Sequence, residues 1–168
     1  DNNLEIIDTN VSVEETVVVV PAEEETTTTT TTTLPENVIA YLEEISSEKI
    51  QSIDIADKVL EANDNWDNQN ITYQEAKDDF AEFIEDTKQF LETVKEPGPP
   101  TTFAGLVKSH EELISLAELI YLDTEELLAG LTSSDTGEQR SSALESFNNN
   151  IDLFQLKIDE IVAINTTS

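Results

Sequence analysis

The sequence of 168 residues contains no cysteine, so neither a disulfide nor a thiol takes part in its folding or function. It has no run of about 18 apolar residues, the length that a membrane-spanning helix requires. Basic residues are scarce, because 8 lysines and arginines stand against 37 aspartates and glutamates, for a net charge of −29. A surface with this charge repels nucleic acid and anionic lipid headgroups, which excludes both as partners.

Methionine is also absent, and the first residue is Asp1. Because translation begins with methionine, we expect that a segment before Asp1 was removed, as the signal peptide of an exported protein is. The sequence therefore predicts an extracellular or cell-surface location. Trimming of the chain for another reason is the alternative.

Sequence patterns of catalytic sites are missing as well. The four glycines stand singly, which leaves no phosphate-binding loop and no nucleophile elbow. The one histidine, His110, has Val107 three residues before it, where a Glu-x-x-His metal motif needs glutamate. We therefore expect no enzyme activity, no catalytic residue and no cofactor. Since His110 falls on the apolar stripe of a predicted helix, we expect it to fill core volume and to form hydrogen bonds there.

Residues 1–33 differ from the rest of the chain. They contain no lysine, arginine or aromatic residue, and they close with PAEEETTTTTTTT. Such a segment cannot bury enough apolar surface to offset the entropy lost on ordering. We predict a disordered, threonine-rich tail or tether at 1–33, followed by a folded domain at 34–168.

One stretch of this tail, VSVEETVVVVP, is strongly β-prone. It could add a strand to the sheet of another chain, as in donor-strand assemblies. The alternative is a disordered, aggregation-prone tail whose flanking glutamates oppose aggregation by their charge. The residues of the candidate assembly strand are Val11, Val13, Val17, Val18, Val19 and Val20.

From Leu34 onward, apolar residues recur every three or four positions, the period of an amphipathic helix. The first two stripes are Val38, Leu42, Ile45, Ile50, Ile53, Ala56 and Val59, and then Tyr73, Ala76, Phe80, Phe83, Phe90 and Val94. The last two are Phe103, Leu106, His110, Leu113, Ala117, Ile120, Leu127 and Leu131, and then Leu144, Phe147, Ile151, Phe154, Ile158 and Ile161.

The helix-capping residues and helix breakers of the sequence agree with this period. A capping oxygen with a glutamate three residues later opens three of the segments, at Thr33–Glu36, Thr72–Glu75 and Asp135–Glu138. The stretch KEPGPPTT cannot continue a helix and separates the second segment from the third. Short connections place consecutive helices antiparallel, so the sequence predicts an all-α, up-down-up-down four-helix bundle.

The stretch NDNWDNQNITYQE has the length of an EF-hand calcium loop when counted from Asp64 to Glu75. The residues that would serve such a loop are Asp64, Asn68, Asn70, Thr72 and Glu75. However, Trp66 stands where a ligand is needed, and Gln69 stands where the sharp turn needs glycine. A capping box formed by Thr72 and Glu75 accounts for the same residues, and we favour this interpretation over a weak calcium site.

Trp66 is a candidate binding residue, because an exposed tryptophan in a polar loop can anchor a partner. The alternative is that Trp66 folds back and covers one end of the bundle.

A resemblance covers the second half of the chain. It is carried by Pro99, Pro100, Phe103, His110, Leu113, the run EELLAGL at Glu125 to Leu131, Ala143 and Leu144. With this pattern, the stretch from Pro99 to about Ile161 resembles a loosely defined set of exported bacterial helical-bundle proteins, many of them lipoproteins, of unknown function. The resemblance implies a surface location and no activity.

These observations favour a cell-surface or secreted, non-enzymatic interaction module, displayed on a flexible tether and binding a protein or cell-surface partner. One alternative is a structural subunit that self-assembles into a filament through the strand at Val11–Val20. A second alternative is a weak calcium-binding module.

Overall fold

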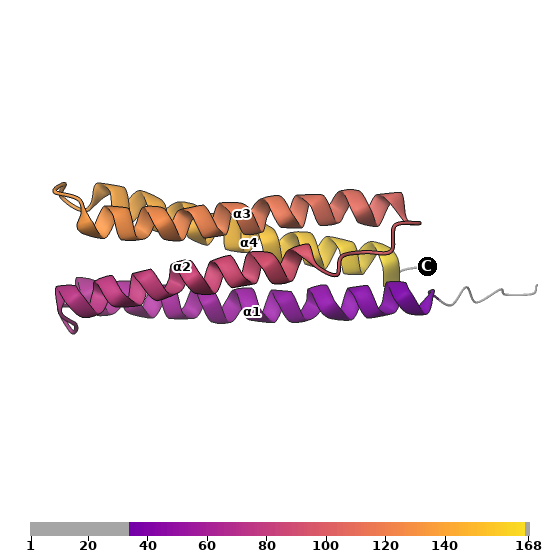
Figure 1. The fold of residues 1–168 in the computed structure, drawn as a ribbon, viewed down its shortest axis with the longest axis horizontal. Coiled ribbons are helices and arrows are strands. Elements are labelled where there is room, and N and C mark those ends of the chain that lie inside the picture. Colours follow the sequence, from indigo (N-terminus) through magenta and orange to yellow (C-terminus); the bar gives the residue numbers. More distant parts are fainter. Residues whose placement is uncertain (1–33, 167–168) are drawn as a thin grey trace, which may run out of the picture. The chain divides into compact units, whose positions relative to one another are not determined.

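A computed structural model describes residues 34–166, which form four long helices joined by short connections (Figure 1). The helices are α1 (Glu36–Asp67), α2 (Tyr73–Lys95), α3 (Ala104–Thr132) and α4 (Glu138–Thr166). No strand occurs within the described range. The predicted all-α fold is confirmed. The tail at 1–33, with its six candidate assembly valines, lies outside the described residues.

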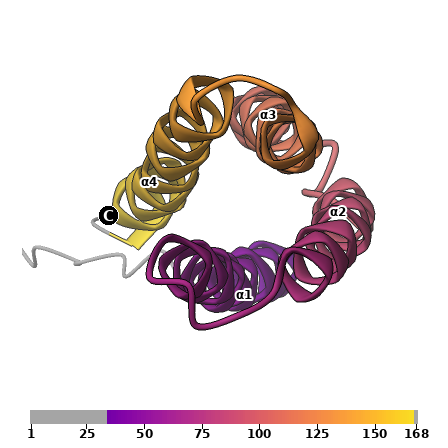
Figure 2. The ribbon, with the colours of Figure 1, turned by 90° about the vertical axis from the view of Figure 1, so that its left-hand side faces the viewer.

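The helices pack in the order in which they follow one another. α1 contacts α2, α2 contacts α3, α3 contacts α4, and α4 returns to α1. Figure 2, a view from the end that carries the α1–α2 and α3–α4 turns, shows the four helices arranged as a ring. Consecutive helices run in opposite directions, which confirms the up-down-up-down topology. No helix in the range 34–166 combines the length and the apolar character that crossing a membrane requires.

The core consists largely of the predicted stripes. Phe80, Phe90, Phe147 and Phe154 have almost no exposed surface, and Phe90 meets Phe154 edge to face with 5.2 Å between ring centroids. Burying one such side chain contributes about 1.5–3 kcal/mol relative to leaving it exposed. His110 is buried at its predicted core position, with 6% of its surface exposed.

The predicted stripe is wrong in the middle of α1. Ile50 and Ile53 remain 70% and 40% exposed, while Glu48 and Ser52 take the core positions. The reason is helical geometry: the step of five residues from Ile45 to Ile50 rotates by about 140°, whereas steps of three and seven stay on one face. Burial therefore follows the rotation of the helix and not the residue type.

Two stripe residues at helix ends also stay outside the core. Tyr73 is 48% exposed at the first position of α2, and Phe103 is 37% exposed just before α3. A helix end has neighbours on one side only, so an apolar residue there covers the rim of the core.

Helix starts follow the predicted capping residues where they are described. Thr72 and Glu75 form a complete capping box at α2. The carboxylate of Asp135 accepts hydrogen bonds from the backbone N–H groups of Gly137 and Gln139 at the start of α4, at 2.8 and 2.9 Å. α1 begins after Pro35, which offers no side-chain cap, and Thr33 lies outside the described residues.

A glycine sets the distance between α3 and α4. A Cβ added to Gly130 would lie 2.6 Å from the Cα of Arg140, closer than side-chain atoms approach a backbone. Gly130 therefore lets the end of α3 and the start of α4 come into backbone contact, and this contact positions Arg140.

Candidate functional site

The α1–α2 turn is shorter than the twelve-residue loop of an EF-hand. α1 continues through Asp67, so Asp64 lies within its last turn, and only residues 68–72 connect it to α2. The backbone carbonyl of Asp64 accepts hydrogen bonds from the backbone N–H and the side-chain amide of Asn68, at 2.9 and 2.8 Å. Gln69 takes a left-handed conformation with φ of 58° where the chain reverses.

The carboxylate of Glu75 is engaged in the capping box of α2. It accepts a hydrogen bond from the Thr72 N–H at 2.7 Å, and the Thr72 hydroxyl accepts one from the Glu75 N–H at 3.2 Å. The hydrogen bond from the Thr72 backbone lowers the pKa of Glu75. The capping interpretation of this stretch is confirmed. Within residues 34–166, no three histidine or acidic side chains converge as a metal site would need.

Trp66 is partly buried and packs against the core at the end of α1. Its ring lies 6.0 Å from the ring of Tyr73 across the turn. The side chain therefore covers the turn end of the bundle, as in the second of the two interpretations of this residue, and keeps part of its ring in contact with water.

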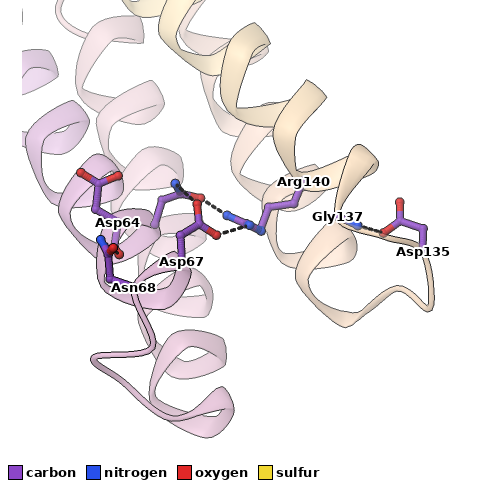
Figure 3. A network of polar contacts seen from close by, with 7 residues as sticks. Asp64, Asp67, Asn68, Asp135, Gly137 and Arg140 are labelled. Atoms are coloured by element: carbon purple, nitrogen blue, oxygen red, sulfur yellow. Dashed lines mark hydrogen bonds and ion pairs between the residues drawn. The ribbon is translucent and has the colours of Figure 1, made fainter.

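The turn end is tied together by Arg140 (Figure 3). Its guanidinium donates hydrogen bonds from α4 to the Asn63 side chain and to the Asp67 carboxylate of α1. Asn63 is 4% exposed, so Arg140 satisfies a buried amide oxygen and an acidic side chain together. Figure 3 shows Asp64 in the last turn of α1 and Asn68 just after α1 beside this network, with Asp135 and Gly137 just before α4. The geometry is that of a structural clamp.

The opposite half of the bundle buries a tyrosine and a histidine together. Tyr41 on α1 and His110 on α3 share a hydrogen bond of 3.2 Å, and their rings meet edge to face at 5.7 Å. Burial lowers the pKa of His110, and the Lys95 carbonyl opposes part of this effect. Nε2 of His110 has no well-aligned hydrogen-bond partner and lies beneath Gly98 in the α2–α3 connection.

Glu48 is a buried carboxyl group that the sequence pattern does not reveal. It is 3% exposed on α1, and its Oε2 atom has no hydrogen-bond partner. Burial, with a further contribution from Glu44, raises the pKa of Glu48 to about 8. The side chain therefore carries a proton at neutral pH. Glu48 lies two helical turns before the buried Ile55, on the same face of α1. The core of a bundle normally has an aliphatic residue at such a position.

The remaining buried polar side chains near the middle of the bundle are paired. The hydroxyl of Thr87 on α2 and that of Thr124 on α3 lie 2.8 Å apart. The amide of Asn150 on α4 donates to the Asp123 carboxylate on α3 at 2.7 Å. Such pairs fix the register of neighbouring helices, because a shift of either helix would strand a buried polar atom.

The outer side of the contact between α3 and α4, which we name the α3–α4 seam, carries exposed leucines. Leu119, Leu122, Leu153 and Leu156 are 45%, 50%, 42% and 55% exposed. We name these four residues the leucine patch. The buried stripes do not predict them, because they lie on other sides of their helices. The available signal in the sequence is their spacing, since each helix contributes two leucines three residues apart on its non-core side.

Comparison with other proteins adds no family to this description. No family model matches the chain, and neither the curated proteins nor the solved structures contain a match to it.

Proposed function

We propose that the chain is a non-enzymatic interaction module, secreted or displayed at the cell surface, with the bundle carried on the tail at 1–33. The observation that carries this proposal is the leucine patch. Large aliphatic side chains from two helices stay in contact with water, although the core of the same bundle accommodates Glu48 and His110. Adjacent exposed apolar side chains on a folded domain are characteristic of binding surfaces.

The chemistry of the described polar groups supports a role without catalysis. The polar clusters hold the fold together, because Arg140 clamps the turn end and Thr72 with Glu75 caps α2. Tyr41 and His110 are buried and hydrogen bond to each other, which joins α1 to α3. The bundle thus acts through its surface.

The proposed location rests on the sequence. The resemblance of the stretch from Pro99 to about Ile161 to exported helical-bundle proteins supports an exported protein. The acidic, threonine-rich composition of residues 1–33 supports a tether that holds the bundle away from its point of attachment.

Two measurements test this function. Protease added to intact producing cells should degrade or release the protein without lysis, and inaccessibility of the protein would contradict the proposed location. Sedimentation of the full chain over a hundredfold range of concentration should give a monomer. Polymers that disappear when residues 1–33 are deleted would instead support the filament subunit.

A further inference from the structure

We infer that the α3–α4 seam is the docking surface for a basic amphipathic helix of a partner protein. This inference deepens the proposed function and rests on it, because it specifies the surface and the partner chemistry of the same interaction module. Four observations carry it: the two apolar ends of the seam, their common line, their spacing, and the acidic side chains beside them.

The apolar residues of the seam fall on one line because of the pairing between α3 and α4. Glu112 forms an ion pair with Lys157, Asp123 accepts from Asn150 at 2.7 Å, and Glu126 accepts from Gln139 at 3.0 Å. On α3, Leu119 lies between Glu112 and Asp123 at steps of seven and four residues. On α4, Leu153 lies between Asn150 and Lys157 at steps of three and four residues. Both leucines therefore occupy the paired sides of their helices.

A second apolar site lies farther along the same line, towards the C-terminal end of α4. It is a hollow of about 420 Å³ between the start of α3 and the end of α4. Its lining includes Phe103, Gly105, Ser109, Ile161 and Ile164. Ile164 is 75% exposed, the highest value among the large apolar side chains of residues 34–166.

The spacing of the two apolar sites suits a helix. Leu153 and Ile164 are eleven residues apart on α4, about 16 Å at 1.5 Å per residue. A partner helix of about four turns covers both sites with one apolar stripe, in the way that amphipathic helices dock into grooves.

Between the two apolar sites, carboxylates outnumber cations by one. The ammonium group of Lys157 is shared by the carboxylates of Glu112 and Glu160. Lys108 lies beside Glu112 and Glu111, so two cations face three carboxylates. Its ion pair with Lys157 lowers the pKa of Glu112, which keeps this carboxylate ionised. A cation in the central turn of a docked helix would compensate the remaining charge.

Rows of acidic side chains also flank the seam on both helices. On α3 they recur at steps of seven residues, as Glu111, Glu118 and Glu125, all exposed. On α4 the exposed residues Glu145, Asp152 and Asp159 repeat the same steps, and Asp159 is paired with Lys49 of α1. An apolar line between two acidic rows is complementary to a helix with an apolar stripe bordered by lysine or arginine on both sides.

The direct test uses the full chain and a fluorescent 18-residue peptide of leucine and lysine whose leucines form one helical stripe. A peptide of the same composition without such a stripe serves as the reference. At about 0.15 M salt, where exposed charges are largely screened, we expect saturable binding of one striped peptide per chain and at least about tenfold weaker binding of the reference. Equal affinities, or no binding of the striped peptide, would overturn the inference.

Matched double variants localise the binding. Leu119→Ser with Leu153→Ser should weaken binding of the striped peptide about tenfold, while Ile50→Ser with Ile53→Ser on α1 should leave the affinity unchanged. Glu118→Gln with Asp152→Asn should weaken it about threefold, more than Glu43→Gln with Asp57→Asn, which removes the same charge from α1. Equal effects of the members of either pair would contradict docking at the seam.

Two further outcomes are distinct. If the wild-type chain forms a dimer that the Leu119 and Leu153 substitutions dissociate, a second copy occupies the seam and the inference is wrong. If the peptide fails to bind while the protein is a monomer accessible on intact cells, the inference falls and the proposed function stands. If the protein is inaccessible on cells, the proposed location falls, whatever the peptide measurement gives.

Discussion

The two halves of the bundle differ in how completely their buried polar atoms are paired. In the half that carries the α1–α2 and α3–α4 turns, the buried amide of Asn63 is bonded to Arg140. In the half that carries the α2–α3 connection, Glu48 and His110 each bury a side-chain atom without a partner. Arg140 joins two helices, while Glu48 lowers the stability of its half. A buried polar atom without a partner costs stability, and a partner from a second helix offsets this cost.

The largest effect is expected from Glu48. Its pKa is about 8 in the folded chain against 4.5 as the ordinary value, so the unfolded chain releases this proton first as the pH rises. The free energy of unfolding therefore falls between about pH 4.5 and pH 8, by up to about 4 kcal/mol from this group. Denaturant unfolding of Glu48→Gln should lack this loss and show higher stability at pH 8.

The control for this prediction is Glu43→Gln, which removes the same charge from the exposed side of α1. It should keep the pH dependence of the wild type. Equal stabilisation by the two substitutions would show that the relief of general acidic repulsion, and not the burial of Glu48, is responsible.

A smaller effect is expected at His110. His110→Ala removes core volume and leaves the Tyr41 hydroxyl without its partner, which should lower the free energy of unfolding by about 1–3 kcal/mol. His110→Leu should cost less, because it keeps most of the volume. Thermal melts compare the two variants, and an unchanged melting temperature of His110→Ala would contradict a structural role.

His110 should also make the free energy of unfolding depend on pH, in the direction opposite to that expected for Glu48. Burial holds its pKa below 6.5, so the unfolded chain takes up the proton first as the pH falls. Wild-type stability should therefore lose a contribution below about pH 6.5, and His110→Leu should remove this contribution. Denaturant unfolding of both proteins from pH 7 to pH 5 measures it, and identical slopes would exclude it.

The clamp at the turn end gives the next prediction. Arg140→Ala leaves the side-chain oxygen of Asn63 buried without its partner and should cost about 1–2 kcal/mol in denaturant unfolding. Lys49→Ala breaks an ion pair with Asp159 in which the two side chains are 29% and 58% exposed, and it should cost less than about 0.5 kcal/mol. Equal costs would mean that burial of Asn63 adds nothing to the clamp.

The smallest effect is expected from calcium. Glu75 is bonded in the helix cap and Asp64 lies in α1, so calcium added to the full chain should cause no saturable change in Trp66 fluorescence below about 1 mM. Saturation at micromolar calcium that Glu75→Ala abolishes would contradict this expectation.

The helical period correctly predicts burial wherever apolar residues recur on one face of a helix. Phe80, Phe90, Phe147 and Phe154 are buried as expected, and Thr72 with Glu75 caps α2 because a cap needs only neighbours in sequence. The prediction is wrong for Ile50 and Ile53, since their apolar character suggests burial while the rotation of α1 turns them outward.

The surface candidates depend on distances between helices, which the sequence does not contain. Trp66 is a candidate anchor by its residue type, and only the packing of the turn brings it to within 6.0 Å of Tyr73. Leu119 and Leu153 become part of one patch because α3 and α4 pair at Glu112–Lys157 and Asp123–Asn150.

By itself, the sequence determined the four helices, the caps of α2 and α4 and the burial of His110, because each depends on residues within a few turns of one helix. The excess of acidic charge follows from the composition alone. Only the tertiary structure decided which side chains from different helices meet. It brought His110 to Tyr41 and Arg140 to Asn63, and it left Glu48 without a partner in the core. The physical reason is that the period of a helix defines a face, while the rotation and the axial position of its neighbours decide what that face contacts.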